Sequence, residues 1–138
     1  MPEYNTADEF SLFNSSIIVI VATDCPLLPH QLKRLSRRVP LGLGRVGGLG
    51  EHFSGDIFLA FSTQRVSDPD DHGLRQIDML RNEKINPLFG AVVQATEEAI
   101  LNALVAAKTT VGINGNTVHA LPHERVQEIL RRYGRLIV

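Results

Sequence analysis

Two polar residues that could take part in catalysis stand two positions apart at the start of a predicted strand. Ser54 and Asp56 lead into an apolar run that ends at Ser62. Side chains of a β-strand alternate between its two faces, so Ser54 and Asp56 are expected to point to the same side, together with Phe58 and Ala60. A hydroxyl and a carboxylate on one face can serve a single reaction centre.

A third polar residue, Ser16, directly precedes the apolar run 17–22. Every residue of that run is apolar and most are β-branched, which predicts a strand covered on both faces. On spacing alone Ser16 is the last polar residue before a core element, and most serines in such a place have no chemical role. Its interpretation therefore depends on the rest of the sequence.

Other motifs give little support for common enzyme classes. Residues 42–47 match G-x-G-x-x-G, but they follow a predicted helix and lead into a strand, the reverse of the order in a dinucleotide site. The chain has no phosphate-binding loop motif, no G-x-S-x-G and no H-E-x-x-H. His119 and His123 are spaced i, i+4, but Pro122 between them argues against a shared helical face. We expect capping or surface roles for these histidines, and neither a metal nor a cofactor.

Composition narrows the classes of partner. The 138 residues carry 14 Lys and Arg against 15 Asp and Glu, a formal charge of −1, which argues against nucleic acid or anionic lipid as partner. A basic stretch lacks interleaved aromatic residues and is expected to be a solvated helix face. It contains His30, Lys33, Arg34, Arg37, Arg38 and Arg45.

The cellular environment is also suggested by composition. A single cysteine, Cys25, excludes an internal disulfide and suits a reducing compartment. No uninterrupted apolar run approaches the ~18 residues of a membrane span, and the first residues lack the apolar core of a secretory signal. We expect a soluble, cytoplasmic protein with no contact to membranes.

The predicted elements alternate between strand and helix, which indicates a mixed α/β fold built in layers. A stripe of alanines at i, i+4 spacing in the longest helix is expected to pack closely against a sheet or helix. Glycines from 42 to 55 predict a loop. The expected elements are strands 17–22 and 56–62, a helix from Pro29 to Arg38 that Pro40 ends or kinks, a helix 86–108 with Ala95, Ala99, Ala103 and Ala107, an extended piece 117–121, and a helix 122–133 ended by Gly134.

Four segments, taken in order, resemble one known family. They read SIIVIVATDCPLLPHQLKRL from Ser16, SGDIFLAFST from Ser54, ATEEAILNALVAA from Ala95 and GNTVHALPH from Gly115. Together they are similar to the β chain of the L-aminopeptidase/D-esterase family, which includes β-peptidyl aminopeptidases. The resemblance runs to about residue 136, so we expect residues 1–14 to be a leader outside the family and residues 15–138 to form one β-chain-like domain.

The resemblance implies a fold and a nucleophile. Members of the family are made as a precursor that cleaves itself before a serine, which becomes the N-terminus of the β chain and the nucleophile. Ser16 matches that serine, and the cleaved bond would join Ser15 to Ser16. The implied fold is a layered αββα sandwich related to N-terminal-nucleophile hydrolases, here only its β-chain part. A free α-amine, with a pKa of about 7.7–8.0, can accept the proton of the adjacent hydroxyl.

The resemblance also assigns supporting residues, a substrate class and a partner. Ser54 would hydrogen-bond within the centre, and Asp56 would orient and stabilise the ammonium that forms. The implied reaction is hydrolysis of N-terminal residues from peptides, or of amino-acid amides or esters, without a metal. In the family an α chain supplies an oxyanion-hole asparagine and most of the substrate pocket. These 138 residues do not contain that chain, so we expect it as a partner.

Two local features depart from the family pattern and motivate an alternative. Ser15 stands where the family has glycine, and His52 and Phe53 stand where it tends to have Asn-Gly. The alternative is a catalytically silent homologue that acts as a self-associating structural or interaction module. Strand edges and apolar surface left uncovered by the α chain would favour homo-oligomers under either hypothesis.

Overall fold

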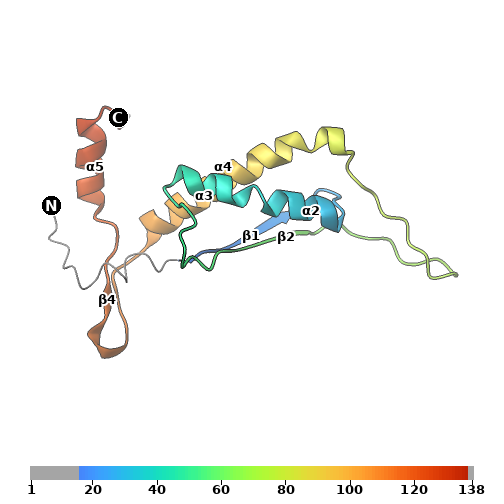
Figure 1. Cartoon of the computed structure of the whole chain (residues 1–138), viewed down its shortest axis with the longest axis horizontal. Helices are drawn as coiled ribbons and strands as arrows, with labels where there is room; N and C mark the ends of the chain where they lie inside the picture. The colour runs from blue at the N-terminus through green and yellow to red at the C-terminus, as the bar shows by residue number, and fades with distance from the viewer. Residues whose placement is uncertain (1–15, 137–138) are drawn as a thin grey trace. The chain divides into compact units, whose positions relative to one another are not determined.

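The computed structural model describes residues 16–136 (Figure 1). These residues fall into two units, one ending at Glu97 and one beginning at Glu98. Each unit is considered by itself. The elements, in chain order, are β1 (Ile18–Thr23), α2 (Pro29–Ser36), α3 (Val39–Arg45), β2 (Ile57–Ser62), the 3-10 turn η2 (Asn82–Lys84), α4 (Asn86–Ala106), β3 (Thr110–Val111), the 3-10 turn η3 (Ile113–Gly115), β4 (Thr117–Val118) and α5 (His123–Arg132). The chain is therefore mixed α/β, as predicted.

The first unit contains a parallel pair of strands, β1 and β2. The register runs from Ile18 opposite Ile57 to Thr23 opposite Ser62. Two parallel strands need a crossover, and α2 and α3 supply it, giving a β-α-β arrangement. Because both strands run the same way, the residues that precede them meet at one end of the sheet.

The sheet has one covered face and one bare face. Val19 and Val21 pack against the core together with Phe58 and Ala60. The alternate side chains face away from it: Ile18 and Ile20 of β1 are 68% and 60% exposed, and Ile57, Leu59 and Phe61 of β2 are also exposed. The prediction of a strand covered on both faces is wrong for this chain, because α2 and α3 cover only one side of the pair (Figure 1).

The core lies between the covered face and the helices. Leu35, Val39 and Ile85 are almost fully buried, and Leu27 and Val92 join them. Burying a branched apolar side chain of this size stabilises a fold by about 1.5–3 kcal/mol. The core therefore holds α2, the start of α3 and the first turns of α4 against the strands.

The basic stretch is less solvated than predicted. The guanidinium groups of Arg34 and Arg38 lie 5.1 Å and 3.8 Å from the ring centre of Phe89 on α4, and both arginines are half-buried. Arg45 pairs with Glu97 at 2.8 Å. Arginine side chains have long apolar stems and flat cationic heads, which explains how they pack on an aromatic ring rather than extend into solvent.

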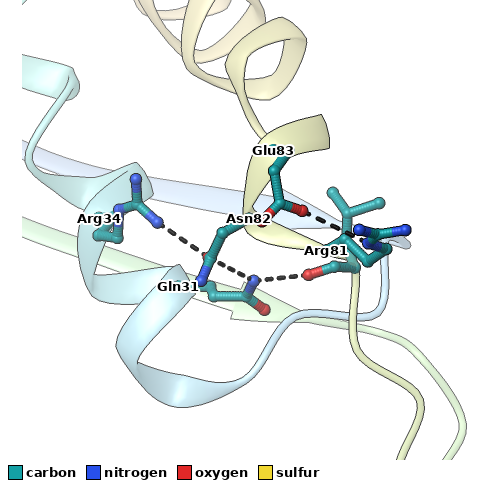
Figure 2. A network of polar contacts seen from close by, with 6 residues as sticks. Gln31, Arg34, Arg81, Asn82 and Glu83 are labelled. Carbon is teal, nitrogen blue, oxygen red and sulfur yellow. Dashed lines mark hydrogen bonds and ion pairs between the residues drawn. The ribbon is translucent and has the colours of Figure 1, made fainter.

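A buried glutamine joins α2 to the segment before α4 (Figure 2). Gln31 has no exposed surface, its Oε1 accepts the N–H of Leu28 at 3.1 Å, and its Nε2 donates to the carbonyl oxygen of Leu80 at 2.8 Å and to Oδ1 of Asn82 at 3.1 Å. Arg34 donates to the same Asn82 oxygen at 3.0 Å. These bonds satisfy a side chain that would otherwise be costly to bury.

The glycine-rich stretch 42–55, predicted to be a loop, begins inside helix α3. Pro40 does not only end α2: it occupies the first turn of a new helix, α3, which continues through Gly42 and Gly44. Gly42 is buried, and a Cβ there would lie 2.6 Å from the carbonyl oxygen of Val93 and 2.7 Å from Cβ of Thr96. The missing side chain lets α3 approach α4, so close packing rather than loop flexibility explains this glycine.

Helix α4 agrees with the prediction in extent but not in its packing face. Val92 and Thr96 are its buried residues, and the Thr96 hydroxyl donates to the Val92 carbonyl oxygen at 2.7 Å. The predicted alanine stripe is exposed among the described residues, so its expected close packing is wrong for this chain. Its members are Ala95, Ala99, Ala103 and Ala107.

Among the described residues, α4 is long and apolar enough, by length and composition alone, to cross a membrane. The sequence was expected to contain no membrane span. Glu97 and Glu98 stand in its sequence, and Glu97 is ion-paired with Arg45. Charged residues are costly inside a bilayer. We therefore interpret the first part of α4 as a helix that packs on protein.

The second unit contains an antiparallel hairpin and the last helix. β3 and β4 pair around η3, and the backbone of Asn114 adopts a left-handed conformation there. α5 ends as predicted, with Gly134 at φ +62° after it. His123 lies 2.9 Å, through Nε2, from the carbonyl oxygen of Val105 in the last turn of α4, which agrees with the capping role expected for it.

Candidate active site

The three residues predicted to do chemistry meet at one end of the parallel sheet. Ser16 lies two residues before β1, and Ser54 and Asp56 lie just before β2. The N–H of Ile57 donates to the carbonyl oxygen of Ile17 at 2.9 Å, so the parallel pairing continues beyond the strand ends. Segments almost forty residues apart in sequence are thereby held side by side.

Ser16 is contacted directly by the segment before β2. Its Oγ accepts a hydrogen bond from the backbone N–H of Gly55 at 2.9 Å. Gly55 has no side chain, and a Cβ built there would lie 3.1 Å from the same Oγ. Ser16 is exposed, so its hydroxyl is held in place and remains accessible to a substrate.

Asp56 holds the backbone next to Ser16. Its Oδ1 accepts the N–H of Ile17 at 3.0 Å, and the residue is half-buried. A carboxylate that accepts a backbone N–H forms a charge-assisted hydrogen bond, which is stronger than a neutral one. Asp56 therefore places a negative charge beside the backbone that joins Ser16 to β1.

Ser54 lies on the Asp56 side of the segment, as the period-two alternation predicted. Ser54, Asp56, Phe58 and Ala60 are all half-buried, whereas the residues between them are exposed. The Ser54 N–H donates to the carbonyl oxygen of Glu51 at 2.8 Å. Within residues 16–136 no hydrogen bond joins the Ser54 hydroxyl to Ser16.

The turn before Ser54 carries the two residues that depart from the family pattern. The rings of His52 and Phe53 meet edge to face, with centres 4.7 Å apart and planes at 69°. Both residues are exposed. An aromatic pair thus occupies the turn that leads directly into the Ser54 to Asp56 segment.

Gly55, which contacts Ser16, was not among the residues predicted from the sequence. The parallel register explains this contact, because pairing Ile18 with Ile57 sets Gly55 opposite Ser16. Ser15 lies outside the described residues. Across residues 16–136 no group of three or more His, Cys, Asp or Glu side chains is arranged to bind a metal.

Chemically, the arrangement combines an accessible hydroxyl, a backbone donor on its oxygen and a carboxylate that is hydrogen-bonded to the N–H of the next residue. A serine becomes nucleophilic when a base takes its proton, and the α-amine of a serine at the start of a chain can be that base. The Asp56 carboxylate contacts the N–H of Ile17, the residue that follows Ser16.

Comparison with known proteins gives a consistent result. The family model described as peptidase family S58 matches residues 3–118. The match includes most of residues 1–14, which the sequence analysis set apart as a leader and which lie outside the described residues. A curated relative, beta-peptidyl aminopeptidase BapA of Sphingosinicella microcystinivorans, is 49% identical over 124 residues, covering 89% of this chain and 31% of its own length.

Solved structures agree with this result. The L-aminopeptidase D-Ala-esterase/amidase of Ochrobactrum anthropi, described as a prototype of the serine aminopeptidases and a variant of the Ntn hydrolase fold, superposes with a TM-score of 0.76 at 43% identity, over 94% of this chain and 36% of that one. A Burkholderia sp. beta-aminopeptidase gives 0.74 at 44% identity, over 88% and 36%. The chain spans about a third of the length of these relatives.

Proposed function

Because this chain belongs to peptidase family S58, we propose that it forms the β-chain part of a serine aminopeptidase whose nucleophile is Ser16. The proposed substrates are peptides, from which the N-terminal residue is removed, and amino-acid amides or esters. The hydrogen bond from Gly55 to Ser16 Oγ is the observation that carries the proposal, because it fixes an accessible serine hydroxyl. The relatives' names, which describe aminopeptidases and a D-Ala-esterase/amidase, support the substrate class.

The nucleophile is first released from the chain. In the proposed self-cleavage Ser16 Oγ attacks the carbonyl carbon of Ser15, the C–N bond to Ser16 breaks, and the resulting ester is hydrolysed by water. The product has Ser16 at its N-terminus with a free α-amine. An amine of this kind titrates near neutral pH and can act as the base.

Turnover then uses both groups of Ser16. Oγ attacks the substrate carbonyl carbon while its proton passes to the α-amine, and the α-ammonium returns the proton to the leaving amine or alcohol. The acyl-enzyme is hydrolysed by water that the amine deprotonates. Asp56, which accepts the N–H of the neighbouring Ile17, stabilises the ammonium, and Ser54 contributes a further hydrogen bond within the centre.

The chain needs a partner to complete this site, and the bare sheet face supports that part of the proposal. Five apolar side chains are exposed on the side of β1 and β2 opposite the helices, and both outer edges of this two-stranded sheet lack a neighbouring strand among the described residues. We propose that an α chain of the same family covers this face and adds strands, completing a layered αββα sandwich. The exposed residues are Ile18, Ile20, Ile57, Leu59 and Phe61.

Coexpression with the α chain of a close relative tests the proposal. The purified complex is expected to hydrolyse amino-acyl p-nitroanilides, and Ser16→Ala is expected to remove the activity while the complex still forms. A complex that forms without hydrolysing any amide or ester would contradict the proposal. It would favour the alternative of a silent, self-associating homologue, for which the same apolar face would be the contact between copies.

A further inference from the structure

We propose that Gly55 is a positioning residue for Ser16: its backbone N–H fixes the serine oxygen, and its lack of a side chain leaves the space that the oxygen occupies. The inference rests on the proposed function, since it assigns Gly55 a part in the chemistry of Ser16. Two independent features of the structure carry it.

The first feature is the hydrogen bond itself. The N–H of Gly55 and Oγ of Ser16 are 2.9 Å apart, an ordinary distance for a well-formed N–H to O bond. A serine hydroxyl has two acceptor lone pairs and one proton. When Gly55 occupies a lone pair, the rotation of the hydroxyl about its Cα–Cβ bond is restricted, and its proton remains free to be given to a base.

The second feature is steric. A Cβ at position 55 would approach Ser16 Oγ to 3.1 Å and Ser16 Cβ to 3.9 Å. The first of these contacts is tighter than ordinary van der Waals separation, so any side chain at this position displaces the oxygen by a few tenths of an ångström. Gly55 keeps a negative φ, so its backbone conformation does not require glycine. The proximity of Ser16 Oγ explains why glycine occupies position 55.

The hydrogen bond from the Gly55 N–H to Ser16 Oγ has a consequence for the proposed reaction. In the proposed reaction the Oγ–H proton leaves for the α-amine of Ser16 as Oγ forms its bond to the substrate carbonyl carbon. A backbone donor on one lone pair of Oγ keeps the oxygen aimed at one point, while the other lone pair forms the bond to the carbonyl carbon. Substitution of Gly55 is therefore expected to slow the chemical step rather than weaken substrate binding.

The first experiment measures amide hydrogen exchange of Gly55 by NMR in the full chain, with no substrate. Replacing Ser16 by Ala removes the acceptor, so the Gly55 N–H is expected to exchange about five- to tenfold faster, while the amide of Ala60 within β2 is unchanged. Equal exchange of Gly55 in both proteins would overturn the inference. This readout does not depend on enzymatic activity.

The second experiment compares Gly55→Ala with Gly90→Ala in the complex with the α chain. A Cβ at Gly90 meets nothing within 4 Å, so that variant is the matched control. Gly55→Ala is expected to lower kcat about tenfold or more with KM within twofold, and Gly90→Ala to leave both unchanged. Complex formation and circular dichroism establish that both variants fold.

The outcomes separate this inference from the proposed function. If the complex hydrolyses substrate through Ser16 and Gly55→Ala keeps the full kcat, the role of Gly55 is rejected and the proposed function stands. If the complex with unaltered Ser16 and Gly55 is inactive, the proposed function is rejected and the catalytic role of Gly55 falls with it, whatever the amide exchange shows.

Discussion

Asp56 Oδ1 accepts the N–H of Ile17 at 3.0 Å, which joins two segments 39 positions apart in the sequence. The bond lies at the end of the parallel sheet where Ser16 also meets Gly55. It connects the stability of β1 with the position of the proposed nucleophile, so substitutions at Asp56 should affect both.

Asp56→Ala is expected to lower the free energy of unfolding by about 1–3 kcal/mol, because it leaves the half-buried N–H of Ile17 without its acceptor. Asp56→Asn keeps an oxygen acceptor and is expected to cost less than Asp56→Ala in urea unfolding. In the complex with the α chain, however, the asparagine lacks the negative charge proposed to stabilise the ammonium. Unchanged stability of Asp56→Ala would show that the bond to Ile17 contributes nothing.

Two glycines of α3 should respond to alanine in opposite directions. A Cβ at Gly42 would lie 2.6 Å from the carbonyl oxygen of Val93, whereas a Cβ at Gly44 meets nothing within 4 Å. Gly42→Ala is expected to destabilise the chain by about 1–3 kcal/mol through overpacking of α3 on α4. Gly44→Ala is expected to stabilise it by about 0.5 kcal/mol, since alanine favours the helix. Thermal or urea unfolding measures both, and the same sign for both would contradict the packing described.

Gln31 is expected to be one of the most sensitive polar positions. Gln31→Met keeps much of the volume but removes three hydrogen bonds, those with Leu28, Leu80 and Asn82. We expect a loss of about 3 kcal/mol in the free energy of unfolding, because buried polar groups lose their partners. Gln94→Met, at an exposed position of α4, is the control and should change stability by less than about 0.5 kcal/mol. Similar values for the two substitutions would disprove the role of Gln31.

A glutamate placed on one or the other face of β1 should distinguish an effect on folding from an effect on binding to the α chain. Ile20 is 60% exposed on the bare face, while Val21 packs against the core. Ile20→Glu is expected to change the stability of the isolated chain by less than about 1 kcal/mol and to raise the Kd for the α chain by about a hundredfold, since a charge would be buried there.

Val21→Glu should instead unfold the chain, because it places a carboxylate in the core. Circular dichroism and analytical ultracentrifugation distinguish the two results. Unchanged binding of Ile20→Glu to the α chain would remove the bare face from the proposed interface.

Much of the fold followed from local patterns. The apolar runs located both strands, Asn86 and Pro87 located the start of α4, and the alternation before β2 placed Ser54 and Asp56 on one side. These features depend on neighbouring residues, which a sequence displays directly. The prediction that Ser16 is the nucleophile rests on the resemblance to a family, because a serine before an apolar strand carries no chemical signal of its own.

The errors concern contacts between distant segments. Gly42 was assigned to a loop because its role depends on Thr96, more than fifty residues away in the chain. Arg38 was expected in solvent because nothing near it in sequence indicates the Phe89 ring. Gly55 was missed for the same reason, since its contact with Ser16 arises only when β1 and β2 pair in parallel.

The intact mass of the chain, purified after coexpression with the α chain, shows whether Ser16 has become an N-terminal residue. We expect a mass equal to residues 16–138, which means that the bond before Ser16 has been cleaved and its α-amine is free. The Ser16→Ala variant should retain the uncleaved mass. A full-length mass for the unaltered chain in the assembled complex would rule out the proposed activation of Ser16, because Ser16 would then lack the amine that is proposed to accept its proton.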